Sequence, residues 1–201
     1  MNETLKILES FARQNHIPVL LDDSAMFLSE FTRKNQYKNI LEIGTAIGYS
    51  GSIMLLESKQ ATLTTIELNQ TSYNMATNTF KTLGLSDRVT QLLGDAYEHI
   101  LILHNQKQKY DLIFLDGPKG QYLRYYPYLL DMLSDGGCLL ADNVLLKGMV
   151  RKEGIIPHKK RAMVTKLKQF VREIETRQDL NTTIHEIGDG IAEIYKKNCS
   201  K

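Results

Sequence analysis

The chain has 201 residues, of which 42% are hydrophobic and 24% are charged, as expected for a single globular domain. Its formal net charge of +2 is too small to indicate a polyanionic partner, so any basic surface must be local. The two cysteines, Cys138 and Cys199, exclude a disulfide framework and a cysteine metal cluster. No apolar run approaches the length of a membrane span, so we expect a cytoplasmic protein with no membrane partner.

The first 36 residues are predicted to form a helical segment that packs on a single domain, 1–201, or on a second subunit of a homodimer. Residues 2–14 have apolar side chains at helical spacing, at Leu5, Ile7, Leu8 and Phe11. A second helix is predicted to begin at a cap formed by Asp22 or Asp23 and to end near Arg33.

The stretch NILEIGTAIGYS, residues 39–50, predicts a buried parallel strand followed by a glycine turn and a helix that begins near Tyr49. Gly44 and Gly48 lie where a ligand could approach the backbone, and the helix N-terminus has free amides to offer it. Ala46 stands where the dinucleotide fingerprint GxGxxG needs its second glycine, which argues against a dehydrogenase. The alternative is a turn that serves only strand-to-helix packing.

Two further strands are predicted after this turn, at residues 61–67 and 88–93. The first ends at Glu67, whose carboxylate can accept hydrogen bonds from both hydroxyls of a ribose. The second is followed by the sequence GDA, residues 94–96. Together with ExGxxxGxS at residues 42–50, these features resemble the S-adenosylmethionine site of class I methyltransferases.

Strands and helices alternate through residue 141, which predicts a parallel sheet with helices on both faces. Strands are predicted at 111–116 and 137–142, and the helix between them has Pro127 at a kink or a late start. Two alternating runs joined by Gly188-Asp189-Gly190 predict a C-terminal antiparallel hairpin. The expected fold is therefore α/β, a Rossmann-like class I methyltransferase with a mostly parallel seven-stranded sheet.

Three side chains with oxygen ligands follow the ends of predicted strands, at Asp116, Asp142 and Asn143. Ligands of open α/β sheets bind outside the carboxyl ends of the strands. Carboxylate and amide oxygens suit Mg²⁺ or another divalent cation, although either aspartate alone could simply cap a helix.

The motifs FLDGPKGQY, residues 114–122, and LLADNV, residues 139–144, resemble the metal-dependent catechol and caffeoyl-coenzyme A O-methyltransferases. The resemblance implies that Asp116, Asp142 and Asn143 hold the metal. It also implies that Lys119 and Asp116 are catalytic, with Lys119 as the base near the acceptor hydroxyl. Lys119 could instead be a solvated lysine, and Leu20 could be a core residue. The resemblance places these residues at S-adenosylmethionine: Leu20, Glu42, Gly44, Gly48, Ser50, Glu67, Asp95, Ala96 and Asp116.

The acceptor side is expected to be more open than a catechol pocket, because Gly117 and Pro118 follow the metal aspartate and the chain has no tryptophan. Three tyrosines, Tyr122, Tyr125 and Tyr126, could stack on bases or pack in the core. A basic stretch could follow a phosphate backbone or be a solvated face; its candidate RNA contacts are Lys147, Arg151, Lys152, Lys159, Lys160 and Arg161.

The GPKGQY, DNV and IGDG motifs are most similar to those of the bacterial tRNA 5-hydroxyuridine methyltransferases. That resemblance implies a tRNA anticodon loop as the substrate and 5-methoxyuridine at the wobble position as the product. Two alternatives stay open: a small-molecule O-methyltransferase that acts on catechols or phenols, and a non-catalytic module that binds the cofactor.

Overall fold

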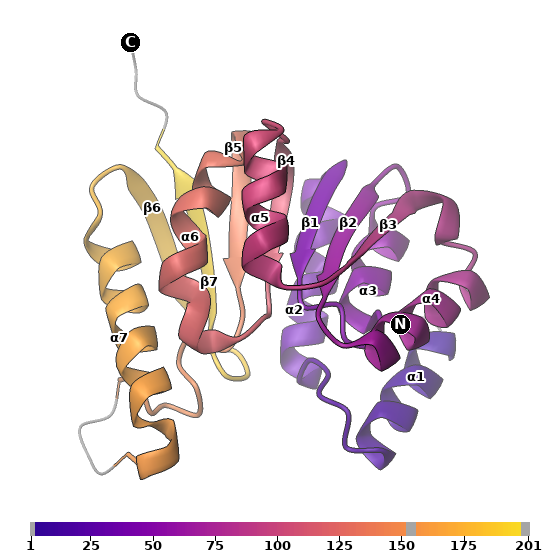
Figure 1. The fold of residues 1–201 in the computed structure, drawn as a ribbon, viewed down its shortest axis with the longest axis horizontal. Coiled ribbons are helices and arrows are strands. Elements are labelled where there is room, and N and C mark those ends of the chain that lie inside the picture. Colours follow the sequence, from indigo (N-terminus) through magenta and orange to yellow (C-terminus); the bar gives the residue numbers. More distant parts are fainter. Residues whose placement is uncertain (1–2, 152–155, 198–201) are drawn as a thin grey trace. The chain divides into compact units, whose positions relative to one another are not determined.

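The computed structural model describes residues 3–151 and 156–197, so Lys152 and Cys199 lie outside the described residues. The strand order is β3-β2-β1-β4-β5-β7-β6 in a seven-stranded sheet (Figure 1). The predicted Rossmann-like α/β class is confirmed, including the antiparallel C-terminal hairpin. The chain divides into two compact units, Met1–His99 and Ile100–Lys201, each described by itself below.

The first unit contains three parallel strands and the helices that pack on them. Strand β2 lies between β1 and β3, with Leu41 opposite Thr64 and Thr65 opposite Gln91. Helix α3 is buried from Tyr49 to Leu55 and packs against α1, α2 and α4. The elements are α1 (Glu3–Gln14), α2 (Asp22–Asn35), β1 (Asn39–Ile43), α3 (Tyr49–Glu57), β2 (Thr62–Glu67), α4 (Gln70–Thr82), a 3-10 turn (Ser86–Arg88), β3 (Val89–Leu93) and the first residues of α5 (Ala96–Asn105).

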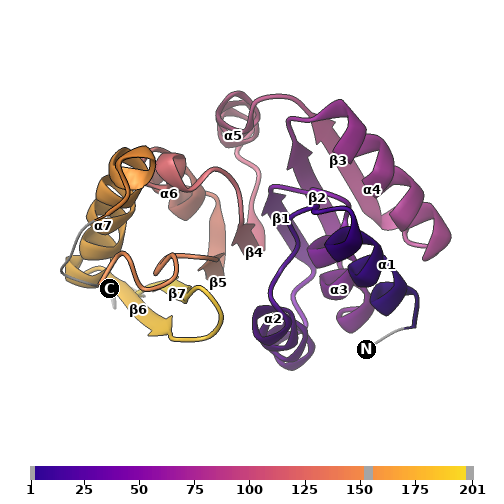
Figure 2. The same cartoon turned by 90° about the horizontal axis from the view of Figure 1, so that it is seen from below.

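The second unit pairs two parallel strands, β4 and β5, with the hairpin of β6 and β7. Strand β7 is antiparallel to both β5 and β6. Helices α6 and α7 lie on the same side of β5, β7 and β6 (Figure 2). The elements are β4 (Tyr110–Leu115), a 3-10 turn (Lys119–Gln121), α6 (Tyr122–Asp131), β5 (Leu133–Ala141), a 3-10 turn (His158–Lys160), α7 (Arg161–Thr176), β6 (Leu180–His185) and β7 (Ile191–Lys196).

The N-terminal helices differ from prediction in two details. Helix α1 buries Leu5 and Ala12, while Ile7 and Phe11 of the predicted apolar face are 65% and 43% exposed. The cap predicted for α2 is wrong, because the N-cap residue is Leu21, whose side chain makes no capping bond. Asp22 and Asp23 lie in the first turn instead, where their negative charges interact favourably with the helix dipole.

Helix α7 was not predicted, although its apolar residues recur with helical spacing. Its buried residues are Val164, Leu167, Phe170, Val171 and Ile174. The tyrosines of α6 pack against this helix, and the ring centroids of Tyr122 and Tyr126 each lie 5.6 Å from that of Phe170. All three tyrosines of α6 that were considered for base stacking are buried, so core packing is their role.

Pro127 lies inside α6, which begins at Tyr122 and not after the proline. No helix in the described ranges, 3–151 and 156–197, is both long enough and apolar enough to cross a membrane.

Candidate functional site

The glycine turn of the first unit joins the end of β1 to the start of α3. Gly44 and Gly48 have φ angles of +101° and +80°, a region that glycine adopts without the strain of a side chain. A Cβ atom on Gly48 would lie 3.0 Å from the ring of Phe80. The turn therefore requires glycine at this position both for its backbone conformation and for its close packing.

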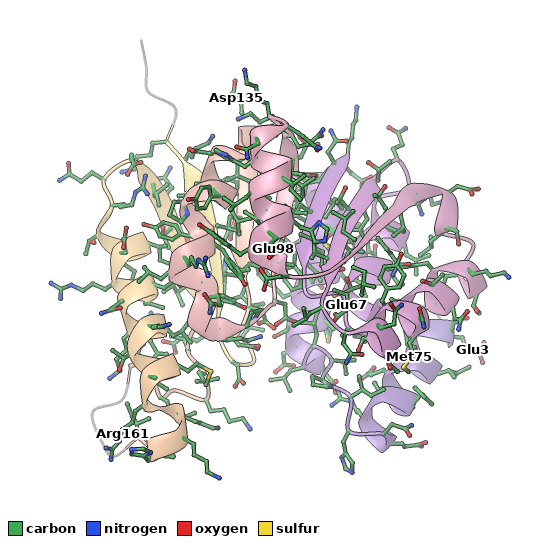
Figure 3. All side chains as sticks on the ribbon, viewed as in Figure 1. Glu3, Glu67, Met75, Glu98, Asp135 and Arg161 are labelled. Carbon is green, nitrogen blue, oxygen red and sulfur yellow. The ribbon has the colours of Figure 1, made fainter. Side chains whose placement is uncertain are left out.

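Glu67, labelled in Figure 3 at the end of β2, ties the turn to the strand. Its Oε2 atom accepts a hydrogen bond from the backbone N–H of Ala46, and Oε1 accepts one from Asn69, both over 2.8 Å. Each carboxylate oxygen has a second lone pair that a ribose hydroxyl could use. The position is thus compatible with the predicted ribose contact and also explains how the turn is held.

Glu42 and Ser50 form a pair beneath the turn. The Glu42 side chain is fully buried, and its Oε1 atom accepts a hydrogen bond from the Ser50 hydroxyl over 2.5 Å. Glu42 therefore lies behind Ser50, which is nearer to the surface of the first unit. Leu20, which was also predicted to contact the cofactor, is buried.

Asp95 precedes α5 and caps it. Its Oδ1 atom accepts hydrogen bonds from the backbone N–H groups of Tyr97 and Glu98, over 2.8 and 3.2 Å. Ala96 is the first residue of the helix, and the Asp95 side chain is exposed. Both capping bonds use Oδ1, so the cap does not require Oδ2.

The second unit brings the predicted metal ligands together as an acidic cluster, which we define as Asp116, Asp142 and Asn143. Strands β4 and β5 end side by side, with Leu115 opposite Ala141, and the Asp142 N–H donates to the Leu115 carbonyl over 3.0 Å. The hydroxyl of the fully buried Tyr122 lies 2.9 Å from the carbonyl of Leu115 and 3.1 Å from that of Asp142, which share its single hydrogen. Sequence reasoning missed this second role of Tyr122, which fixes both strand ends.

The side chains of the acidic cluster are only partly satisfied. Lys119 Nζ donates to Asp116 Oδ1 over 2.6 Å, and Asn143 Nδ2 donates to Asp142 Oδ2 over 3.0 Å. Asp142 Oδ1 is buried and has no hydrogen-bond partner among the described residues. Asn143 has a φ angle of +58°, a conformation that asparagine tolerates better than most residues. The cluster thus contains a buried oxygen that is available to a cation or to a hydrogen-bond donor.

The pKa values of the two aspartates in the acidic cluster are also compatible with a bound cation. Burial raises the pKa of Asp142 to about 7, and the nearby charge of Asp116 contributes to that rise. Burial also raises the pKa of Asp116, and Lys119 partly opposes that shift. A cation would relieve this repulsion and satisfy Asp142 Oδ1, so the residues fit a divalent metal. Within the described part of the chain no three or more His, Cys, Asp or Glu side chains group as a metal site, and the set here is two carboxylates and an amide.

The hairpin between β6 and β7 clamps the loop that follows the acidic cluster. The N–H groups of Val144 and Leu145 donate to the carbonyls of Gly190 and Asp189, over 3.0 and 2.9 Å. Asp189 Oδ1 accepts from the Lys147 N–H over 3.2 Å. The glycine signal had predicted the turn, but not this contact with the loop.

All of the predicted RNA contacts that the structure describes are exposed, and Arg151 is also paired with acidic side chains. Arg151 forms ion pairs with Glu186 and with Glu175, the latter over 3.6 Å. Lys147 is exposed. We call the remaining three the α7 basic group; all are exposed at the start of α7, where Figure 3 labels the third, and they are Lys159, Lys160 and Arg161.

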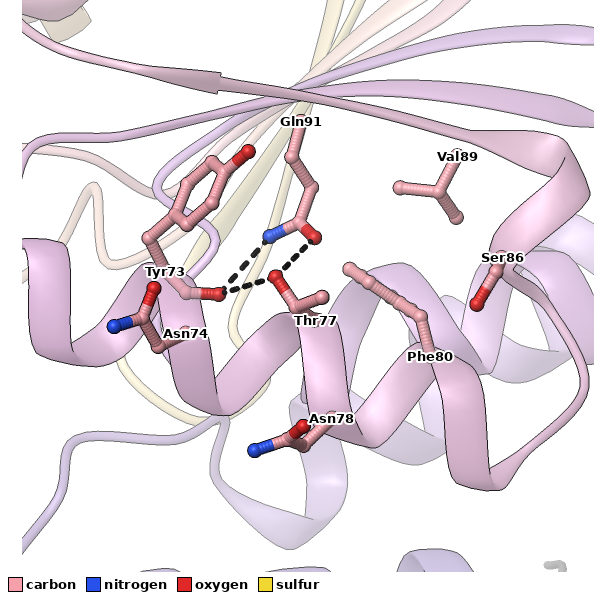
Figure 4. Close-up of a pocket in the computed structure, with 8 residues that line it drawn as sticks. All are labelled: Tyr73, Asn74, Thr77, Asn78, Phe80, Ser86, Val89 and Gln91. Carbon is pink, nitrogen blue, oxygen red and sulfur yellow. Dashed lines mark hydrogen bonds between the residues drawn. The ribbon is translucent and has the colours of Figure 1, made fainter.

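Two grooves are lined by other residues. One, of about 510 Å³, lies between α4 and β3, where Thr77 donates to Gln91 and Gln91 donates to the Tyr73 carbonyl (Figure 4). The other, of about 570 Å³, includes His104, Lys109 and Asp131. No predicted site residue within the described ranges lines either groove.

Comparisons with known proteins agree with the geometry of both units. A family model described as O-methyltransferase matches residues 2–197. The tapetum-specific methyltransferase 1 of Arabidopsis thaliana is 29% identical over 172 residues, which cover 84% of this chain and 74% of the plant protein.

Solved structures extend the comparison. A protein from Staphylococcus aureus, assigned as a caffeoyl-CoA O-methyltransferase, has a TM-score of 0.89 and 30% identity, covering 98% of this chain and 93% of that one. An O-methyltransferase from Bacillus cereus in complex with SAH shares the fold, with a TM-score of 0.84 and 22% identity over 98% of this chain and 92% of its own.

Proposed function

Because this chain belongs to the O-methyltransferase family and depends on S-adenosylmethionine, we propose that it methylates a hydroxyl group presented at the acidic cluster with the help of a divalent metal. We further propose that this hydroxyl belongs to 5-hydroxyuridine at the wobble position of tRNA. The observation that carries the metal dependence is Asp142 Oδ1, a buried carboxylate oxygen with no partner in the described part of the chain. Burying this oxygen without a partner is costly, and a bound cation would offset that cost.

In this proposal Asp116, Asp142 and Asn143 hold the divalent ion. When bound, such an ion lowers the pKa of a coordinated hydroxyl and orients it for attack on the methyl group. The acceptor oxygen forms its bond to the methyl carbon as the bond from that carbon to sulfur breaks, so the protein contributes mainly position and electrostatics. Tyr122 supports the arrangement by bonding to the backbone at both strand ends.

Lys119 is assigned as the group that takes the proton from the acceptor hydroxyl. Its Nζ atom is held at the cluster by the contact with Asp116. An ammonium cannot accept a proton, so the lysine must first become neutral. The proposal assigns Ser50, together with Glu67 and Asp95, to the cofactor: Ser50 to its amino-acid end, and the two acids to its ribose and adenine.

The RNA acceptor is supported by the α7 basic group. Its three side chains are exposed, and α7 has no acidic residue in its first turn. Positive side chains at a helix N-terminus are unfavourable in isolation, and a phosphate would compensate them. An anticodon base lies in a loop and can enter a pocket at low unstacking cost. We expect the proposed reaction to take place in the cytoplasm, together with tRNA.

A small-molecule acceptor is favoured by a different observation. Arg151 is neutralised by Glu175 and Glu186, which removes one cation from the predicted RNA contacts. A phenolic acceptor would need none of these charges.

A direct comparison of acceptors tests the proposal. The protein is incubated with methyl-labelled S-adenosylmethionine, Mg²⁺ and one of three acceptors: tRNA that carries 5-hydroxyuridine, caffeoyl-CoA, or catechol. We expect label in tRNA, recovered as 5-methoxyuridine after digestion to nucleosides. Label in catechol or caffeoyl-CoA with none in tRNA would overturn the RNA assignment and leave the O-methyltransferase assignment intact.

A further inference from the structure

A chain of buried hydroxyl groups lies beneath the glycine turn of the first unit. Thr65 Oγ1, in β2, donates to Glu42 Oε2 over 2.6 Å, and Thr45 Oγ1, in the turn, lies 2.6 Å from Thr65 Oγ1. The other oxygen of Glu42 accepts from Ser50. The side chains of Thr45, Thr65 and Glu42 are buried, so water does not compete for these bonds.

The number of hydrogens fixes the direction of the chain. A hydroxyl group has one hydrogen, and the hydrogen of Thr65 is used in the bond to Glu42. Thr45 must therefore donate to Thr65. The result is an ordered sequence in which Thr45 donates to Thr65 and Thr65 donates to Glu42, and each bond polarises the next.

This arrangement restrains the turn at both ends. Thr45 follows the first glycine of the turn, and Ser50 lies in the first turn of α3, so both segments are joined to the same carboxylate. Glu42 packs closely against α3, because a Cβ atom added to Gly51 would lie 3.1 Å from its Oε2 atom. The position of the Ser50 hydroxyl thus depends on a carboxylate that Thr65 orients.

We propose that Thr65 and Thr45 are positioning residues for S-adenosylmethionine, acting through Glu42 to hold Ser50 and the glycine turn in the conformation that binds the amino-acid end of the cofactor. The inference rests on the proposed function in one respect, the contact of Ser50 with that end. Thr65 and Thr45 themselves need not touch the cofactor.

Two ligands separate this role from ordinary core packing. S-adenosylhomocysteine has the amino-acid end, and 5′-methylthioadenosine lacks it while keeping the nucleoside. Calorimetry on the full chain compares wild type with Thr65→Val, which keeps the shape and removes the hydroxyl, and with Thr65→Ser, which restores it. We expect Thr65→Val to weaken S-adenosylhomocysteine about tenfold, to change methylthioadenosine less than about twofold, and Thr65→Ser to recover most of the loss.

The controls distinguish the inference from its premise. Ser50→Ala should weaken S-adenosylhomocysteine selectively, and an unchanged affinity would defeat the assumed Ser50 contact. If Ser50→Ala behaves as expected but Thr65→Val weakens both ligands equally, or neither, the positioning role is wrong. If Thr65→Val fails to fold, Thr45→Val and its rescue variant Thr45→Ser take its place, because Thr45→Val removes only the first donor of the hydroxyl chain. Equal weakening of both ligands by Thr45→Val, or of neither, would again overturn the positioning role.

Discussion

Lys119 donates a hydrogen bond from Nζ to Asp116 Oδ1 over 2.6 Å, and the two side chains are only 18% and 23% exposed. The ammonium of Lys119 therefore competes with the proposed metal for the carboxylate of Asp116. Replacing Lys119 by Met should tighten Mn²⁺ binding severalfold, because a competing positive charge is removed, while methyl transfer falls by about 10²–10⁴-fold if the lysine is the base. Calorimetry and a labelled-methyl assay measure the two effects.

Lys166 offers a matched control for that experiment. Its side chain lies beside Gly120, with Cδ 4.0 Å from the position of a Cβ added to that glycine. Lys166→Met removes a positive charge from the neighbourhood and leaves the Lys119–Asp116 pair in place, so it should leave Mn²⁺ affinity unchanged. Equal effects of the two substitutions would show that only the general charge of the surface matters.

Asp142→Asn should abolish binding of the divalent ion and leave S-adenosylhomocysteine binding intact, because the residue belongs to the acidic cluster and not to the glycine turn. The metal-free variant should melt at or above the wild-type temperature, since the substitution removes a buried charge that has an unpaired oxygen. Thermal unfolding and metal titration provide the test. A variant that still binds Mn²⁺ with wild-type affinity would place the ion elsewhere.

Gly190→Ala should destabilise the protein by about 2–5 kcal/mol, combining a strained backbone with overpacking. Its φ angle is +88°, and an added Cβ would lie 2.4 Å from Leu145 Cγ. Gly136→Ala is the matched control, because its φ angle is +75° but nothing lies within 4 Å of the added atom. In chemical denaturation, Gly136→Ala should lower the free energy of unfolding by only about 1–2 kcal/mol. A similar loss for Gly190→Ala and Gly136→Ala would refute the hairpin clamp.

The free energy of unfolding should fall between pH 9 and pH 12, partly because of Cys138. Burial raises the pKa of this thiol from 9.0 to about 12, so the unfolded chain ionises in that range while the folded thiol stays protonated. A raised pKa of this kind means that stability is lost as the pH rises, by about 1.4 kcal/mol at pH 10. Cys138→Ala should flatten the pH dependence above pH 9, and an unchanged slope would contradict this assignment.

Neutralising the α7 basic group, as Lys159→Gln, Lys160→Gln and Arg161→Gln together, should raise the Michaelis constant for tRNA. The logarithmic salt slope should fall by roughly 0.7–0.9 for each phosphate that the protein no longer neutralises. Arg151→Gln should have a smaller effect, because that arginine is already paired with two carboxylates. Wild-type kinetics and salt dependence in the triple variant would show that the α7 basic group does not contact the phosphates of tRNA.

The sequence predicted the strand ends well, because glycines and acids after buried strands have few structural alternatives. The strands predicted to end at Glu67 and Leu93 end there, and those predicted to end at Asp116 and Asp142 end one residue earlier, at Leu115 and Ala141. Helix α3 begins at Tyr49, as predicted. The meeting of Asp116 with Asp142 follows from the parallel pairing of those two strands. Such positions depend on local pattern and topology, which a single sequence contains.

Side-chain partners were harder to predict. That Glu42 bonds to Thr65, 23 positions away, depends on the register of β1 and β2. The ion pairs of Arg151 depend on how α7 and the hairpin pack. Helix α7 was missed because its basic first residues continue the charged stretch before it, although apolar residues with helical spacing follow. These features depend on tertiary contacts, which neither charge runs nor periodicity specify.

The most direct test of the proposed function measures methyl transfer to tRNA that carries 5-hydroxyuridine, using metal-stripped protein, labelled S-adenosylmethionine and added Mg²⁺ or Mn²⁺. We expect no transfer by stripped protein, recovery when either ion is added, and no recovery for Asp142→Asn. Full activity of the stripped wild-type protein in the presence of a chelator would contradict the metal-dependent mechanism.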